Sequence, residues 1–137
     1  MNHLMFDVDG TLVESYGFDE RLFMDSVKEV TGITLINNWE TYPDVTDRGI
    51  LKTFIERQLP DFSLSELEDS VKAVFVTKVR EYLIDHPATE VSGAIAFINS
   101  LRARQDVVIS IATGGWGETA IAKLESAGFN IEGIPLA

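Results

Sequence analysis

The chain of 137 residues contains no cysteine, so it has no disulfide framework, no thiol nucleophile and no zinc–thiolate site. Positive charge is also scarce, with 11 lysine and arginine residues against 22 aspartate and glutamate residues and a formal net charge of −11. Such a charge disfavours nucleic acid and anionic membranes as partners, and neither is expected. The apolar stretches are short, and the first three residues lead straight into an expected strand, which leaves no room for a signal peptide. We therefore expect a cytoplasmic globular protein.

The most informative segment is residues 4–13, LMFDVDGTLV. Its apolar run at residues 4–6 predicts a buried parallel strand, and the strand ends in Asp7 and Asp9 before a turn at Gly10. Ligands of open α/β sheets bind at the carboxyl ends of strands. Two residues of strand span about 7 Å and point their side chains to one face, which leaves room for a phosphoryl group or a metal ion. An Asx-rich turn without a ligand is the alternative interpretation.

A second segment with the same character lies at residues 107–117, VVISIATGGWG. The β-branched, uncharged run at 107–112 predicts another buried strand, and Thr113 and Gly114 follow where a helical pattern begins. A hydroxyl group and free backbone N–H groups at such a turn can bind an anion. A glycine-rich loop without a ligand would have the same composition.

Helical periodicity replaces the strand pattern between these two segments, from residue 17 to about residue 85. Gly32 is placed to end the first helix, Pro60 stops the second, and Ser63-x-x-Glu66 is a capping-box pattern that opens the third. The apolar stripes of these helices are, in order, Leu22, Phe23, Val27 and Val30; Ile50, Leu51, Phe54, Ile55 and Leu59; and Leu67, Val71, Val74 and Phe75.

The remaining core elements are expected around the second strand. Residues 91–104 predict a crossover helix that leads into it, residues 120–127 predict the next helix, and residues 131–136 predict the start of a third core strand. Lys123 lies on the second of these helices, and we expect it on a solvated helix face.

The pattern Asp7-x-Asp9-Gly-Thr-Leu-Val resembles the first motif of the haloacid dehalogenase (HAD) superfamily and, within it, that of the phosphoglycolate-phosphatase-like phosphohydrolases. The resemblance implies that Asp7 is the nucleophile that forms an aspartyl-phosphate and that Asp9 is the general acid and base. It also implies Mg²⁺ as cofactor, bound by the Asp7 carboxylate and the Asp9 backbone carbonyl. A hard cation is chemically reasonable, because a carboxylate must otherwise attack a phosphorus that carries negative oxygens. Thr113 and the Gly114 N–H correspond to the second motif, which binds phosphoryl oxygens.

The resemblance also implies an α/β fold, namely a HAD-like Rossmannoid three-layer core with a partial sheet and an inserted small helical cap. The core would comprise residues 1–15 and 87–137 and the cap residues 16–86, with linkers near 14–16 and 86–89. Such a cap excludes water from the site and supplies specificity. An ordinary helical subdomain would show the same apolar stripes.

The resemblance further implies that cap residues near the polar loop at 42–48, YPDVTDR, contact the substrate, as they do in related phosphatases. Asp44 or Thr46 can cap the helix that follows, and the N-terminus of that helix would then favour an anion. Arg48 can bind a phosphate or carboxylate in a forked geometry, so it is the first choice as substrate ligand and Thr46 the second. In the alternative interpretation, Arg48 pairs with Asp44 or Asp47 on a solvated face.

The third and fourth motifs of the superfamily, a Lys or Arg and one or two further acids, are not found before residue 137. We therefore expect a chain that is truncated after the second motif, inactive as it stands, and able to self-associate through the unpaired edge of its first strand. The predicted function of the parent protein is Mg²⁺-dependent hydrolysis of a phosphomonoester, with a small phosphorylated metabolite as substrate. A catalytically inactive HAD-fold fragment or binding protein and a sugar phosphomutase are the alternatives.

Overall fold

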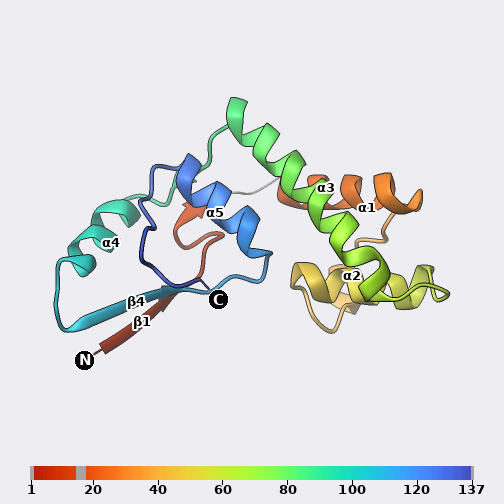
Figure 1. Ribbon diagram of the computed structural model, residues 1–137, viewed down its shortest axis with the longest axis horizontal. Coiled ribbons are helices and arrows are strands. Elements are labelled where there is room, and N and C mark those ends of the chain that lie inside the picture. The colour runs from red at the N-terminus through yellow and green to blue at the C-terminus, as the bar shows by residue number, and fades with distance from the viewer. Residues whose placement is uncertain (1, 15–17, 137) are drawn as a thin grey trace. The chain divides into compact units, whose positions relative to one another are not determined.

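The computed structural model describes residues 2–14 and 18–136, and the chain divides into two compact units (Figure 1). The α/β unit comprises Met1–Tyr16, Arg80–Thr113 and Gly117–Ala137. The helical unit comprises Gly17–Val79 together with the short segment Gly114–Trp116. The chain is therefore a mixed α/β protein, as the sequence predicts.

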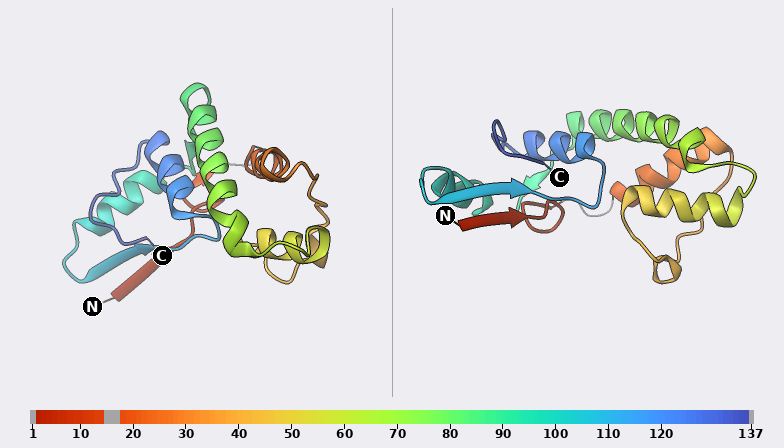
Figure 2. Two further views of the ribbon diagram at one scale, coloured as in Figure 1. Left: turned by 45° about the vertical axis from the view of Figure 1, so that its right-hand side comes forward. Right: turned by 60° about the horizontal axis from the view of Figure 1, so that its bottom comes forward.

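The α/β unit is built on two parallel strands, β1 (Asn2–Phe6) and β4 (Val107–Ile111). Their register runs from Asn2 opposite Val107 to Phe6 opposite Ile111, and the strands lie side by side in both views of Figure 2. The predicted parallel pairing is thus correct. The predicted burial of β1 is wrong, since Leu4 is 36% and Met5 62% exposed. Within the described residues β1 pairs with β4 alone, so its other edge has no strand to cover it.

Helices and a small ribbon complete the α/β unit. α4 (Ala94–Arg102) packs beside β4 and precedes it as the crossover helix, and α5 (Gly117–Ser126) follows β4. The short strands β2 (Val13–Glu14) and β3 (Thr89–Glu90) pair in antiparallel fashion.

The third core strand expected at residues 131–136 is not formed. A turn interrupts the segment, because Gly133 has a φ of 78° and the N–H of Ile134 donates to the carbonyl of Ile131 at 3.0 Å. The chain reaches β4 only afterwards, where the N–H of Ile111 donates to the carbonyl of Pro135 at 2.8 Å. A single parallel bridge between Ile111 and Leu136 marks where a strand would begin.

The helical unit contains α1 (Asp19–Thr31), the short 3₁₀ helix η1 (Trp39–Thr41), α2 (Asp47–Gln58) and most of α3 (Leu64–Asp85). The predicted stop signals hold: Gly32 ends α1 with a φ of 76°, and α2 ends just before Pro60. At the start of α3, the Glu66 carboxylate accepts hydrogen bonds from the N–H and the hydroxyl group of Ser63 at 3.2 and 2.9 Å, as one half of a capping box would.

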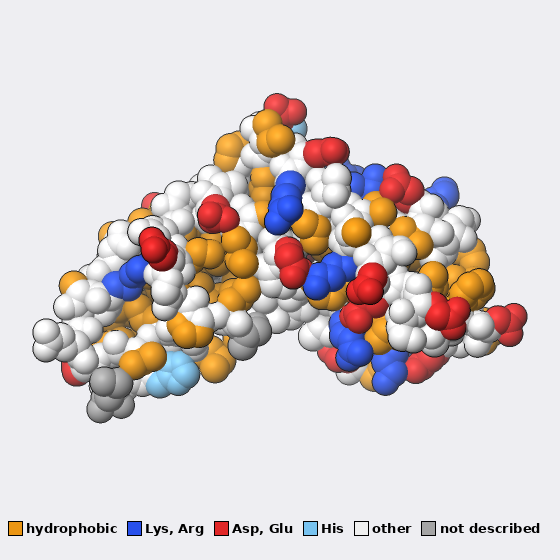
Figure 3. Space-filling view, in the orientation of Figure 1, with side chains coloured by type: hydrophobic (Ala, Val, Ile, Leu, Met, Phe, Trp, Pro, Cys, Tyr) orange, Lys and Arg blue, Asp and Glu red, His pale blue; other side chains and the backbone are white. Residues whose placement is uncertain are grey.

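The predicted apolar stripes form the core of this unit, where the fully or nearly fully buried side chains include Phe23, Val27, Leu51, Phe54, Ile55, Val71 and Phe75. Its surface mixes charged side chains of both signs (Figure 3). None of the helices in the described part of the chain is long and apolar enough to span a membrane.

Candidate active site

Two carboxylates lie in the tight turn that follows β1. Val8 is fully buried, whereas Asp7 and Asp9 on either side of it are exposed. The carbonyl of Val8 accepts the N–H groups of the three residues at 11–13, at 3.2, 2.9 and 3.1 Å, and Gly10 completes the turn with a φ of 78°. The Asp7 Oδ1 atom accepts the N–H of Val8 at 2.8 Å, which orients the Asp7 carboxyl group.

Lys123 contacts this turn and is buried. Its Nζ atom lies 3.0 Å from Asp9 Oδ1, in an ion pair whose side chains are 4% and 40% exposed respectively. The expectation that Lys123 lies on a solvated helix face is therefore wrong. The physical reason is that the carboxylate of Asp9 compensates the cost of taking the ammonium group out of water.

The spacing of buried residues on α5 places Lys123 on the apolar face of the helix. The buried positions of the helix are Thr119, Ala120, Lys123 and Leu124, which follow the i, i+1, i+4, i+5 spacing of one helical face. Ile121 is 37% exposed. Lys123 stands one turn after Thr119 and Ala120, so its position on the apolar face was readable from the sequence. The strong general preference of lysine for the surface outweighed it.

Thr113 leaves the sheet at the same end as Asp7. The N–H of Ala112 donates to the carbonyl of Phe6 at 2.8 Å, which extends the pairing of β1 and β4 by one step. Asp7 follows Phe6 directly and Thr113 follows Ala112, so both segments emerge from the carboxyl end of the parallel pair. This is the edge at which α/β proteins bind ligands.

Gly114, the second predicted phosphate ligand, belongs to the helical unit with Gly115 and Trp116. Its carbonyl accepts the N–H of Asp47 at 2.9 Å, and the carboxylate of Asp47 accepts the N–H of Trp116 at 3.0 Å. A Cβ atom built on Gly114 would lie 3.7 Å from the Thr46 methyl group, so these two predicted site residues are neighbours. The sequence pattern indicates Asp47 only as an alternative ion-pair partner of Arg48, and it carries no signal of the contact with Trp116.

Aromatic packing holds Trp116 within the helical unit. Its ring centroid lies 5.9 Å from that of Phe23 on α1 and 6.0 Å from that of Phe75 on α3, and the two phenylalanine rings lie 5.3 Å apart. Trp116 is 9% exposed, and both phenylalanines are buried. The segment after Thr113 is thus bound to α1, α2 and α3 together.

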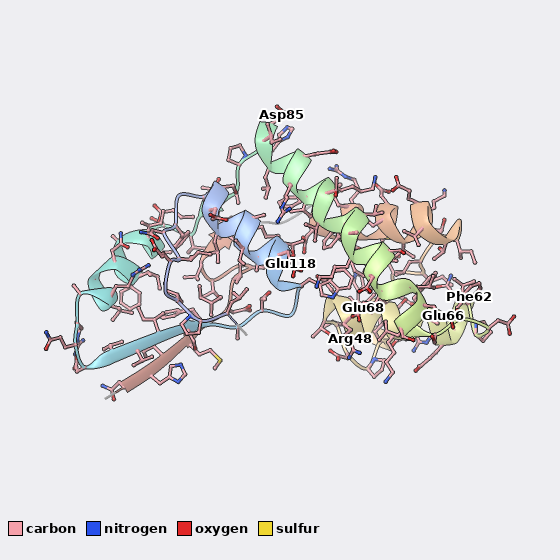
Figure 4. All side chains as sticks on the ribbon, in the orientation of Figure 1. Arg48, Phe62, Glu66, Glu68, Asp85 and Glu118 are labelled. Carbon is pink, nitrogen blue, oxygen red and sulfur yellow. The ribbon has the colours of Figure 1, made fainter. Side chains whose placement is uncertain are left out.

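The two cap residues predicted to bind substrate have structural partners. Thr46 is the N-cap of α2, because its hydroxyl oxygen accepts the N–H of Gly49 at 3.0 Å. One of the two capping residues expected from the sequence is therefore confirmed. The Arg48 Nε atom lies 3.0 Å from Glu68 Oε2 on α3, and the arginine side chain remains 67% exposed (Figure 4).

The donor set near β1 suits a hard cation in chemical type. Asp7 and Asp9 offer carboxylate oxygens, and Mg²⁺ is commonly held by one or two carboxylates together with water and substrate phosphate. In the described ranges, no group of three His, Cys, Asp or Glu side chains is gathered closely enough to hold a metal ion. The two oxygen donors that the resemblance implies, the Asp7 carboxylate and the Asp9 backbone carbonyl, would need water and substrate oxygens to complete a coordination sphere.

Comparisons with known proteins agree with this architecture. A search of curated proteins finds no match. Among solved structures, a hydrolase from Pseudomonas syringae is similar at a TM-score of 0.70 and 18% identity, over 99% of this chain and 60% of that one. A HAD hydrolase of family IA, variant 3, from Entamoeba histolytica HM-1:IMSS gives a TM-score of 0.64 at 16% identity, over 99% and 61% of the two chains.

A proposed beta-phosphoglucomutase from Thermotoga maritima is also similar, with a TM-score of 0.54 and 18% identity over 99% of this chain and 61% of that one. The chain therefore spans about 60% of the length of these structures. The family model of the haloacid dehalogenase-like hydrolases matches residues 4–131. On that match, which includes both predicted motifs, the chain belongs to the haloacid dehalogenase-like hydrolase family.

Proposed function

We propose that the protein is a Mg²⁺-dependent phosphomonoester hydrolase that acts on a small phosphorylated metabolite through an aspartyl-phosphate on Asp7. The observation that supports this most directly is the arrangement at the end of β1. Two exposed carboxylates lie two residues apart in a tight turn, and a buried ammonium group lies 3.0 Å from one of them. Thr113 leaves the sheet at the same end, and it carries a hydroxyl group suited to a phosphoryl oxygen.

The proposed reaction has two steps. In the first, a carboxylate oxygen of Asp7 attacks phosphorus, the bond from phosphorus to the ester oxygen breaks, and the leaving oxygen takes a proton from Asp9. In the second, Asp9 accepts a proton from water, the water oxygen attacks phosphorus, and the bond to Asp7 breaks to release phosphate. The hydrogen bond from the Val8 N–H orients the Asp7 carboxyl group for attack.

Positive charge is needed at this site because the chain carries a net charge of −11, which repels phosphorylated substrates at long range. Lys123 supplies one such charge close to Asp9, where burial keeps it only weakly screened. Mg²⁺ bound by Asp7 and Asp9 would supply the rest by neutralising phosphoryl oxygens during the transfer. The helical unit is proposed as the cap, with Arg48 and then Thr46 as residues that contact the substrate.

Binding of fluoroberyllate, a phosphoryl mimic, tests the nucleophile without requiring a complete turnover. We expect Mg²⁺-dependent binding detected by ¹⁹F NMR, and loss of that binding in Asp7→Asn at unchanged far-UV circular dichroism. Asp69→Asn is the matched control, because it makes the same change at an exposed position on α3. Equal binding to wild type and Asp7→Asn would contradict the assignment.

The products released and the binding of phosphorylated ligands distinguish two alternative functions. A phosphomutase would return phosphate to a sugar hydroxyl, so it would interconvert hexose phosphates rather than release inorganic phosphate. A binding protein without activity would bind phosphorylated ligands without forming a bond to Asp7. We also propose that the open edge of β1, with its exposed Leu4 and Met5, is a surface for self-association.

A further inference from the structure

The turn that follows Thr113 has high intrinsic backbone flexibility. Gly114 and Gly115 stand in succession, and glycine has more backbone freedom to lose on ordering than any other residue. A backbone N–H group that binds a phosphoryl oxygen must nevertheless be held in position before the ligand arrives. Some contact outside the turn must therefore supply its order.

Asp47 supplies contacts on both sides of Gly115. Its N–H donates to the carbonyl of Gly114 at 2.9 Å, and its carboxylate Oδ2 accepts the N–H of Trp116 at 3.0 Å. The second bond has an ionised acceptor, and hydrogen bonds of this kind are stronger than bonds between neutral groups. The two bonds together fix the peptide groups that flank Gly115.

The position of Asp47 at the start of α2 makes this bridge rigid. Thr46 caps the helix through the N–H of Gly49, so the N–H of Asp47 is left to bond outside the helix. The N–H groups of Asp47 and Gly49 are therefore both used by the protein. The Asp47 carboxylate lies at this helix N-terminus, where the helix dipole favours a negative charge.

We infer that Asp47 is a positioning residue, which holds the segment Gly114–Trp116 to the helical unit and thereby restricts the conformations open to Gly114, whose N–H is proposed to bind a phosphoryl oxygen. This inference rests on the proposed function for the role of the Gly114 N–H, but the bridge itself does not. Gly114 is joined covalently to Thr113, so order imposed on the segment Gly114–Trp116 also limits the conformations open to the peptide group between these two residues.

Hydrogen–deuterium exchange of the Gly115 and Trp116 amides tests the bridge in the full chain. In Asp47→Ala we expect exchange at Trp116 to rise about 10-fold or more, the scale set by loss of a hydrogen bond to a charged group. Asp47→Asn keeps an acceptor oxygen without the charge, so exchange at Trp116 should rise clearly less than in Asp47→Ala. Glu66→Ala is the matched control, since it removes a hydrogen-bonded first-turn carboxylate from α3 in the same unit.

The affinity for fluoroberyllate with Mg²⁺ gives the second readout. We expect it to fall about 10-fold in Asp47→Ala, to be largely retained in Asp47→Asn, and to be unchanged in Glu66→Ala. If Asp47→Asn loses affinity as fully as Asp47→Ala, the charge at the helix N-terminus is responsible and the inference is overturned. Unchanged exchange at Trp116 in Asp47→Ala overturns it as well.

Failure of the proposed function leaves a different pattern. In one outcome, wild type binds no fluoroberyllate while Trp116 exchange still depends on Asp47. In that case the hydrogen bonds of Asp47 are supported and the proposed phosphate binding is contradicted. If Asp47→Ala fails to fold, Asp47→Asn is compared with wild type instead. The inference predicts that the side-chain oxygen of the introduced asparagine still accepts the Trp116 N–H. Exchange at Trp116 that is as fast as in the unfolded chain would overturn it.

Discussion

Lys123 Nζ lies 3.0 Å from Asp9 Oδ1, and this contact joins residues 114 positions apart in the sequence. The two partners differ in burial, since the lysine side chain is 4% exposed and the aspartate side chain 40% exposed. Removal of Lys123 and removal of Asp9 therefore have different effects on stability. Without the lysine, the carboxylate can be solvated, whereas without the carboxylate a buried ammonium group loses a charged partner.

We predict that Lys123→Met, which keeps an unbranched apolar stem, changes the free energy of unfolding by less than about 1 kcal/mol. Asp9→Ala should destabilise the chain more, by about 1–3 kcal/mol, because it takes the carboxylate partner from a buried donor. Fluoroberyllate binding should fall at least about 10-fold in Lys123→Met, the scale of one lost interaction with a charged group. Urea denaturation and ¹⁹F NMR measure the two effects.

The exposed lysine at position 52 provides the control, since Lys52→Met removes one charge from a solvated part of α2. It should leave both unfolding and fluoroberyllate binding as in wild type. A larger loss of stability in Lys123→Met than in Asp9→Ala would contradict the asymmetry.

Much of the fold follows from local signals in the sequence. Apolar stripes at helical spacing and the stop signals at Gly32 and Pro60 predict α1 and α2, whose observed ends agree. The two strands that precede the motifs are also predicted, together with their parallel pairing. These elements can be predicted because they depend on residues near one another in the sequence and on the spacing of apolar residues along a helix or strand.

The incorrect predictions concern features that depend on residues far apart in the sequence. The burial expected for β1 depends on a second neighbouring strand, which the described residues do not provide. The position of Lys123 depends on a carboxylate far away in sequence, and the bridge from Asp47 to Trp116 joins residues 69 positions apart. Each of these features depends on a tertiary contact, and hydrophobic periodicity does not identify the partner in such a contact.

The proposed acid–base role of Asp9 predicts a dependence on the leaving group. Asp9→Asn should slow the hydrolysis of alkyl phosphates such as glycolate phosphate by about 10²- to 10⁴-fold. The loss should be far smaller for p-nitrophenyl phosphate, because nitrophenolate leaves without taking a proton. Steady-state kinetics on the two substrates measures the difference. An equal loss on both would mean that Asp9 acts chiefly through the metal rather than as an acid.

A pH-dependent change in stability is predicted at Tyr42. The side chain is 7% exposed, and its hydroxyl donates to the carbonyl of Ile36 at 2.6 Å. Burial raises the pKa of Tyr42 above its ordinary value, although the positive charge of Arg57 opposes the shift. The neutral phenol is thus favoured in the folded state. Its contribution to stability is complete below the unfolded pKa of about 10 and is lost as pH rises through the higher folded pKa.

Tyr42→Phe should lower the free energy of unfolding by about 0.5–1.5 kcal/mol at neutral pH, the usual contribution of one hydrogen bond. The difference from wild type should narrow above about pH 10, where the phenol no longer favours the folded state. Tyr82→Phe is the control, since it keeps the ring that stacks on His86 at a centroid distance of 4.6 Å. Urea denaturation at several pH values measures the difference, and a gap that stays constant with pH would contradict the prediction.

The last prediction separates two roles of Arg48, whose Nε atom lies 3.0 Å from Glu68 Oε2 (Figure 4). An exposed ion pair of this kind contributes about 0.2–1 kcal/mol, so Arg48 can leave Glu68 for a substrate anion at small cost. If Arg48 binds the substrate, Arg48→Ala should raise KM for small anionic phosphate esters about 10-fold or more, in line with a charge-assisted hydrogen bond. Arg48→Ala should change KM for p-nitrophenyl phosphate only slightly, because this ester lacks the metabolite part that distinguishes a natural substrate.

Glu68→Gln breaks the same ion pair but leaves the guanidinium group in place, so it is the matched control for Arg48→Ala. A substrate-binding arginine predicts that Glu68→Gln leaves KM unchanged or lowers it, because Arg48 no longer has to leave a partner. A purely structural pair predicts that both variants lose the same small amount of stability and that neither changes KM. Steady-state kinetics combined with urea denaturation of the two variants distinguishes these roles, and parallel behaviour of Arg48→Ala and Glu68→Gln would remove Arg48 from the site.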